Sequence, residues 1–188
     1  MKKIIAVIIS FYLSFIIGHL ALVHAEYVLP YPSYMPGNKM YRVSRILDTV
    51  KKFWYWGTIA QIKYHLGLSD KYLVEAKTLF EYKQYLLATD ALKRSDAALA
   101  DIPSLINKGS GEGKDMSQFA KTVVEAMQVH VEKLTAMAGQ LPGEFLWTPE
   151  KKDATNLSIE QMLNTSTSIR QKIINELQTR IQRFTDAT

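Results

Sequence analysis

The chain has 188 residues, 47% of them hydrophobic, which is enough to bury one ordinary core. It contains no cysteine, which excludes a disulfide framework, a cysteine-ligated metal site, a thiol nucleophile and a lipid-modified N-terminal cysteine. Of the net charge of +5, a net +4 falls in residues 26–66, whereas residues 67–188 hold fifteen basic and sixteen acidic side chains. This uneven charge suits anionic lipid headgroups better than a nucleic acid, which we do not expect as a partner.

The first 25 residues have the three parts of a secretory signal. Lys2 and Lys3 precede an apolar run over residues 4–23, and Val23-His24-Ala25 places small or apolar side chains where signal peptidase cleaves. We therefore expect export, with cleavage between Ala25 and Glu26 as the favoured outcome. About 20 apolar residues also suffice to span a bilayer, so an uncleaved anchor is the alternative.

Residues 26–37 form a segment rich in proline and tyrosine. Pro30, Pro32 and Pro36 prevent a helix, so we expect an extended chain. We interpret it as a strap, with Tyr31 and Tyr34 lying on the helical body, although a plain proline-rich linker is the commoner case.

A first helix is predicted from a cap at Gly37 or Asn38 to about Trp56. One face of this helix carries the apolar side chains Met40, Val43, Ile46, Leu47, Val50 and Trp54. Other faces carry the basic side chains Arg42, Arg45, Lys51 and Lys52.

The four aromatic residues at 53–56 cannot all point inward, because four consecutive residues circle a whole helical turn. They are expected to close one end of the bundle, to meet a membrane interface or to line a ligand groove. The candidate contact residues for a membrane or a partner are Arg42, Arg45, Lys51, Lys52, Phe53, Trp54 and Trp56.

Residues 58–106 predict a helical hairpin with its turn at residues 82–84. Apolar and small side chains recur at steps of three and four in both halves. The second half uses the smaller residues, so the two helices can approach closely.

The run YVLPYPSYMPGNKMYRVSRILDTVKKFW, followed by KYHLGLSDKYLVEAKTLFEYKQYLLATDALKRS, resembles an uncharacterised bacterial family of exported helical domains. Its members show a signal or anchor helix, an LPYPxxxP strap and a leucine- and alanine-rich hairpin. The resemblance covers about residues 27–96. It departs from the family at Gly37-Asn38-Lys39 and Ser69-Asp70, and it implies compartment and fold without an activity.

The distal half begins with a glycine-rich stretch, residues 108–115, which predicts a flexible linker. A long amphipathic helix then runs from Met116 to near Gly139. Residues 141–152 are expected to form a loop from which Phe145, Leu146 and Trp147 dock on the core. A capping box of Ser158 and Gln161 predicts the start of the last helix.

These elements predict an all-α protein, in which a signal or anchor helix and a strap precede an antiparallel bundle of about five helices. The expected divisions are residues 1–25, the strap, an N-terminal helical domain at 38–107, the linker, and a C-terminal hairpin at 116–188 packed on the first part.

Residues with the spacing of a catalytic or metal site are not evident. His65 and His130 are the histidines outside the signal, and neither has a Glu-x-x-His partner. Helix carboxylates such as Glu75 and Glu81 are expected on a solvated face. We therefore expect no enzyme activity, no metal and no cofactor.

The leading hypothesis is a non-enzymatic, exported cell-envelope protein that binds another envelope protein or an anionic membrane surface. An ectodomain of a membrane-anchored sensor or regulator is a second possibility. A small-ligand binder, with a pocket formed by Trp54, Trp56, Tyr64 or Trp147, is the third. The partner and the oligomeric state stay open.

Overall fold

The computed structural model describes residues 27–150 and 153–186, so the predicted signal, the anchor and the Ala25–Glu26 junction lie outside the described residues. The helices are α2 (Lys39–Trp54), α3 (Thr58–Glu81), α4 (Tyr85–Leu99), α5 (Ile102–Gly111), α6 (Ser117–Ala138) and α7 (Ile159–Asp186). Strand β1 (Glu144–Trp147) pairs antiparallel with β2 (Thr155–Ser158). The predicted helical bundle is confirmed, with a small sheet added to it.

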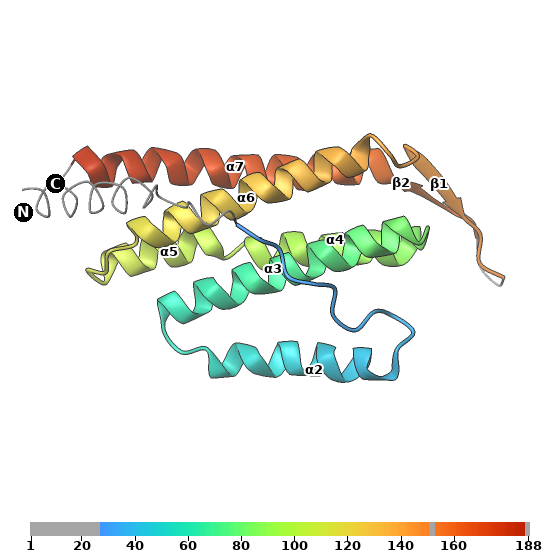
Figure 1. Cartoon of the computed structure of the whole chain (residues 1–188), viewed down its shortest axis with the longest axis horizontal. Helices are drawn as coiled ribbons and strands as arrows, with labels where there is room; N and C mark the ends of the chain where they lie inside the picture. Colours follow the sequence, from blue (N-terminus) through green and yellow to red (C-terminus); the bar gives the residue numbers. More distant parts are fainter. Residues whose placement is uncertain (1–26, 151–152, 187–188) are drawn as a thin grey trace, which may run out of the picture.

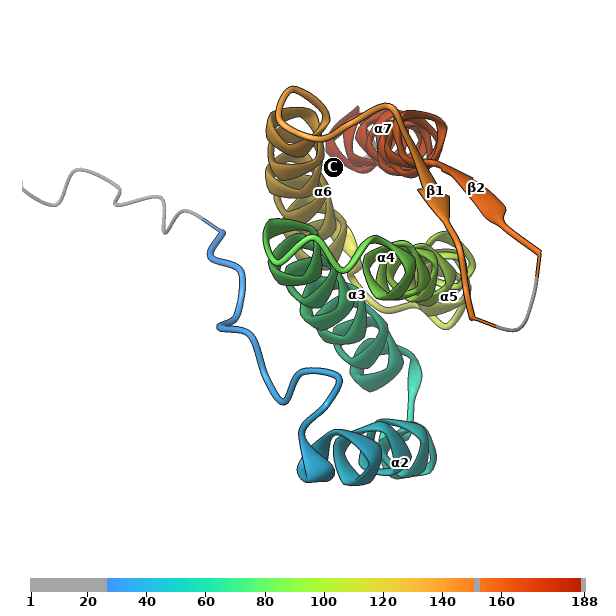
Figure 2. The same ribbon diagram turned by 90° about the vertical axis from the view of Figure 1, so that its right-hand side faces the viewer.

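Four helices form the body of the bundle. Viewed along their axes, α3, α4, α6 and α7 stand at four corners, and α5 continues the line of α4 (Figure 2). Helix α2 lies outside this body, beside α3 (Figures 1 and 2). The bundle therefore has a complete set of core-forming helices without α2.

The core joins the two halves of the sequence. One cluster of buried residues packs Ile62 and Leu66 of α3 against Met127 of α6 and Leu177 of α7. A second cluster packs α3 and α4 against α6 and the start of α7. The N-terminal and C-terminal helices thus share one hydrophobic core.

The flexible linker predicted at residues 108–115 is wrong for its first part, because Lys108 to Gly111 complete helix α5. Gly109 is buried there, and a Cβ atom at this position would lie 2.5 Å from the Sδ atom of Met116. Glycine is therefore used for close packing between α5 and the segment that leads into α6.

The predicted hairpin of α3 and α4 is confirmed, with its turn at Tyr82 to Gln84. The backbone N–H of Gln84 donates to the carbonyl of Leu79 over 2.9 Å, and Lys83 has a φ of 57°. This is a Schellman-type helix ending. The second helix does not continue to residue 106 as predicted, because the chain breaks after Leu99 and Pro103 lies in the first turn of α5.

The loop predicted at residues 141–152 contains strand β1. Phe145 packs against Tyr85 with ring centroids 4.5 Å apart, as expected. Leu146 is 63% exposed, so the expectation that it docks on the core is wrong. Adjacent residues of a strand point to opposite sides, and only one of these two can face the bundle.

Residues 27–38 contain no helix or strand and run along the outside of the bundle (Figure 2). Tyr27, Leu29 and Met35 pack on the two core clusters. Tyr31 is 95% exposed and Tyr34 49%, so the side chains predicted to lie on the helical body are the wrong ones.

Within the described part of the chain, no helix combines the length and the apolar character that crossing a membrane requires.

Candidate functional site

Helix α2 packs on the bundle with its polar side, which is the reverse of the usual arrangement of an amphipathic helix. The residues that face α3 are Tyr41, Ser44, Arg45 and Asp48, of which only Asp48 is fully buried. Asn38 caps the helix as predicted, its side chain accepting a hydrogen bond from the backbone N–H of Met40 over 2.9 Å. Among helices α2 to α7, α2 separates its polar and apolar sides most strongly.

Asp48 is the centre of the contact between α2 and α3. Its carboxylate forms an ion pair with Lys71, whose Nζ atom also donates to Ser44 Oγ over 2.9 Å. The hydroxyl of Tyr72 donates to the same carboxylate over 3.3 Å, and the hydroxyl of Tyr64 donates to the backbone carbonyl of Asp48 over 2.6 Å. Buried acceptors of this kind need donors, and α3 supplies all three.

A second polar contact lies two turns toward the start of α2. Glu75 accepts hydrogen bonds from the Tyr41 hydroxyl over 2.7 Å and from Arg94 over 2.9 Å. Glu75 is 2% exposed, so the prediction that this carboxylate lies on a solvated face is wrong. Glu75 and its partners Tyr41 and Arg94 thus help to hold α2 on the bundle.

Arg45 belongs to this polar contact as well. Its guanidinium carbon lies 5.3 Å from the ring centroid of Tyr72, in a cation–π contact. Burial raises the pKa of Tyr72 to about 12, although the Arg45 charge acts in the opposite direction. Because it faces α3, Arg45 does not share the outer surface with the other predicted contact residues.

The apolar side of α2 is exposed over its whole length. The exposed side chains are Met40 46%, Val43 42%, Ile46 63%, Leu47 50%, Val50 48%, Phe53 75% and Trp54 82%, and Trp56 just beyond the helix is 83% exposed. We call these eight residues the outer face of α2. Contiguous apolar surface of this extent on a folded protein marks a site of interaction.

The aromatic residues at 53–56 do not close the end of the bundle. Phe53, Trp54 and Trp56 surround a hollow of about 340 Å³ that faces solvent. Tyr55 turns back and stacks on Tyr64 with ring centroids 5.3 Å apart. Three of the four rings therefore extend the outer face of α2.

Basic side chains accompany the outer face. Arg42, Lys51 and Lys52, three of the predicted contact residues, are exposed, as is Lys39 at the start of the helix. Helical geometry places Arg42 and Lys51 on opposite edges of the apolar stripe. Lys52 follows Arg45 by seven residues and therefore lies on the same side of the helix as Arg45, away from the stripe. The sole acidic residue of α2 is the buried Asp48.

The pocket considered for a small ligand is not formed by its predicted residues. The end of α2, at Trp54, lies at one end of the molecule, and strand β1, which contains Trp147, lies at the other (Figure 1). The hydroxyl of Tyr64 is engaged by Asp48.

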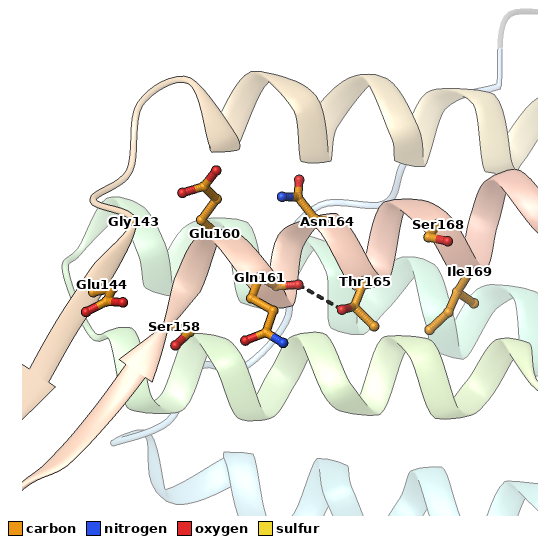
Figure 3. A pocket seen from close by; sticks show the side chains of 9 residues that line it. All are labelled: Gly143, Glu144, Ser158, Glu160, Gln161, Asn164, Thr165, Ser168 and Ile169. Atoms are coloured by element: carbon orange, nitrogen blue, oxygen red, sulfur yellow. Dashed lines mark hydrogen bonds between the residues drawn. The ribbon is translucent and has the colours of Figure 1, made fainter.

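A hollow of about 630 Å³ lies where β1 and β2 meet α7 (Figure 3). Glu160 and Asn164 project from α7, and each of the hollow's lining residues is exposed or half-exposed. Most of its lining residues are of polar types and the hollow is open to solvent, whereas sites that bind small molecules are enclosed and largely apolar.

Inside the bundle, a set of polar side chains links four helices and the segment that precedes α2. We call it the buried polar network, and its members are Tyr27, Asp70, Ser95, Asp96, His130, Ser166 and Arg170. His130 Nε2 lies 2.8 Å from Asp70 Oδ1, and Arg170 Nε donates to His130 Nδ1 over 3.2 Å. Arg170 also forms an ion pair with Asp96 at 2.6 Å.

The network is closed to solvent at its centre. His130 and Arg170 are both 0% exposed. Burial and the Arg170 charge lower the pKa of His130, although its hydrogen bond to Asp70 opposes the shift. The hydroxyl of Tyr27 donates to Asp70 over 2.5 Å, and burial raises the pKa of that tyrosine. A sealed arrangement of this kind positions helices and does not admit a substrate.

Groups of three or more histidine, aspartate and glutamate residues suited to a metal do not occur in the part of the chain that the structure describes. Comparison with known proteins matched no family model, no curated protein and no solved structure. The outer face of α2 is thus the feature of the described chain that most directly indicates a function.

Proposed function

We propose that this chain is a non-enzymatic, exported cell-envelope protein that acts by docking through the outer face of α2. The observation that carries the proposal is which side of this helix faces the bundle. Its polar side contacts α3, and its apolar side faces solvent.

The cost of this arrangement supports a docking role. Each large apolar side chain left in water forgoes about 1.5–3 kcal/mol of burial free energy. The bundle has a complete core without α2, so the outer face of α2 is not needed for folding. A helix of this kind is explained if its apolar side is buried when the protein is at work.

The export part of the proposal rests on the sequence. Lys2 and Lys3 ahead of the apolar run over residues 4–23 are typical of a secretory signal. Cleavage after Ala25 would leave Glu26 as the first residue, one position before Tyr27, which the bundle holds through Asp70.

Photocrosslinking in cells that make the protein tests the proposal. A benzophenone amino acid replaces Ile46 on the outer face, and a matched protein carries it at Lys93, which is exposed on α4. We expect adducts in the envelope fraction at position 46 and few at position 93. Mass spectrometry of the recovered protein identifies the adducts and also gives its N-terminus, which we expect at Glu26.

Equal labelling at positions 46 and 93 would contradict docking through α2. Recovery of the protein solely from the cytosol would contradict export. The two parts of the proposal are therefore tested separately by one preparation.

A further inference from the structure

We infer that the occupant of the outer face is the surface of an anionic lipid bilayer, with α2 lying in the plane of the interface. This inference rests on the proposed docking function and names its partner. It follows from the charge, the aromatic residues and the orientation of α2.

The charge of α2 favours an anionic partner. Lys39, Arg42, Lys51 and Lys52 are exposed, and the helix exposes no acidic residue because Asp48 is buried against Lys71. Basic side chains beside an apolar stripe extend their charged ends toward phosphate groups while their methylene chains stay on apolar surface. Anionic lipids attract such segments with about 1 kcal/mol per charge.

The side-chain types of the outer face fit the boundary between headgroups and acyl chains. Aliphatic residues fill the middle of the stripe, and Phe53, Trp54 and Trp56 lie at its end. Tryptophan concentrates at membrane interfaces because its ring is amphipathic. A strongly amphipathic helix with basic edges is the usual element that lies on a bilayer.

The same features disfavour a second copy of this chain. Two α2 helices packed through their outer faces would bring the basic edges of their two stripes together. The exposed surface of α2 offers no carboxylate to neutralise them. Like charges placed opposite one another oppose such a contact.

The orientation of α2 also favours a bilayer surface. The helix runs alongside the bundle, with its long axis near that of α3 (Figure 1). The polar contacts to Lys71 and Glu75 fix its inner side, so the stripe points directly away from the bundle. The bundle would therefore lie flat on a bilayer with α2 between them.

Flotation of the mature protein, which is expected to begin at Glu26, with lipid vesicles tests this inference. The vesicles contain equal parts of phosphatidylcholine and phosphatidylglycerol, or phosphatidylcholine alone. We expect binding to the anionic vesicles and much weaker binding to the neutral ones. The double variant Arg42→Gln/Lys51→Gln should bind the anionic vesicles roughly 10–30-fold more weakly, because the charges at both edges of the stripe are lost.

Two control variants separate α2 from the rest of the surface. Lys93→Gln/Lys172→Gln removes the same charge from exposed positions on α4 and α7 and should bind as the unaltered protein does. Ile46→Ser/Trp54→Ser on α2 should abolish binding, whereas Leu86→Ser/Leu87→Ser, at partly exposed positions of α4, should not.

Absence of binding to anionic vesicles, with protein adducts at position 46 in the crosslinking experiment, would overturn the lipid inference and leave docking through α2 intact. Equal loss of binding in the α2 and control variants would also overturn it. Circular dichroism of each variant shows whether its helices are retained, so a binding loss in a folded variant is attributed to the surface.

Discussion

At the residue scale, His130 is the most constrained titratable group of the bundle. Its neutral ring accepts a hydrogen bond from Arg170 at Nδ1 and donates to Asp70 from Nε2. Protonation at Nδ1 would place an N–H against the N–H of Arg170 and bury a second positive charge. The groups around it from the other elements are Asp70 of α3, Asp96 of α4, Arg170 of α7 and Tyr27.

This environment makes the stability of the protein depend on pH. The pKa of His130 is lowered in the folded protein, chiefly by burial, so below its ordinary value of 6.5 the unfolded chain binds the extra proton. The contribution of neutral His130 is fully present above pH 6.5 and is lost as the pH falls through the lowered pKa. The loss is at most about 1.4 kcal/mol per pH unit.

Urea unfolding at pH 7.5 and 5.5 measures this effect. We expect His130→Gln to remove part of the pH dependence of the unfolding free energy. Gln128→Ala, at an exposed position of α6 that carries no titratable group, is the control and should leave that dependence in place. An unchanged pH dependence in His130→Gln would show that this ring does not carry it.

The buried polar network was not predicted from the sequence. His130 lies three and four residues from Met127 and Leu134, and Arg170 lies between Ser166 and Ile173, all at buried positions. A polar residue at a core position of an apolar helical stripe could have indicated that His130 and Arg170 are buried. The pairing itself was out of reach, because Asp70 and Arg170 are brought together by helix packing across 100 positions of sequence.

At the element scale, α2 is attached to the bundle differently from the other helices. Its contacts with α3 are hydrogen bonds and ion pairs around Asp48 and Glu75, not packed aliphatic side chains. Charged hydrogen bonds contribute about 1.5–3 kcal/mol each when they are protected from water. Loss of these polar contacts should therefore release α2 from α3 while the core of the bundle stays folded.

Hydrogen exchange of the variant Asp48→Ala tests this attachment. Exchange in α2 should become faster by a factor that corresponds to about 2 kcal/mol, because Lys71 and Tyr72 lose their shared acceptor. Exchange in α4 should not change. Glu132→Ala, which removes an exposed ion pair on α6, is the control and should leave α2 as it is. Equal exchange of α2 in all three proteins would contradict the polar attachment.

The extent of α2 could be predicted from the sequence, but the side of the helix that faces the bundle could not. Periodicity gave the stripe from Met40 to Trp54 and the cap at Asn38, because both are local. A pattern of this kind separates two sides of a helix without saying which of them meets the bundle. The deciding partners are Lys71, Glu75 and Arg94, which lie on other helices.

At the scale of the whole molecule, the chain divides into a bundle with a complete core and a helix displayed beside it. The hairpin of α3 and α4 and the long helix α6 followed from their apolar spacing. The strands β1 and β2 did not, since four-residue segments carry too short a pattern. The helical end of α5 was hidden by its glycines, which pack closely instead of forming a linker.

The distribution of tryptophan allows the central claim, docking through the outer face of α2, to be measured directly. The chain has three tryptophans, and Trp54 and Trp56 are the two on that face. Replacing the third in a Trp147→Phe variant leaves an emission spectrum that reports on the end of α2 alone.

We would record this spectrum with membrane vesicles from cells that make the protein, which contain both lipid and membrane proteins. The account predicts the red-shifted emission of exposed indoles in buffer, and a blue shift with protection from a soluble quencher once vesicles are added. Emission and quenching that stay the same with and without vesicles, in a protein that remains folded, would contradict docking through α2.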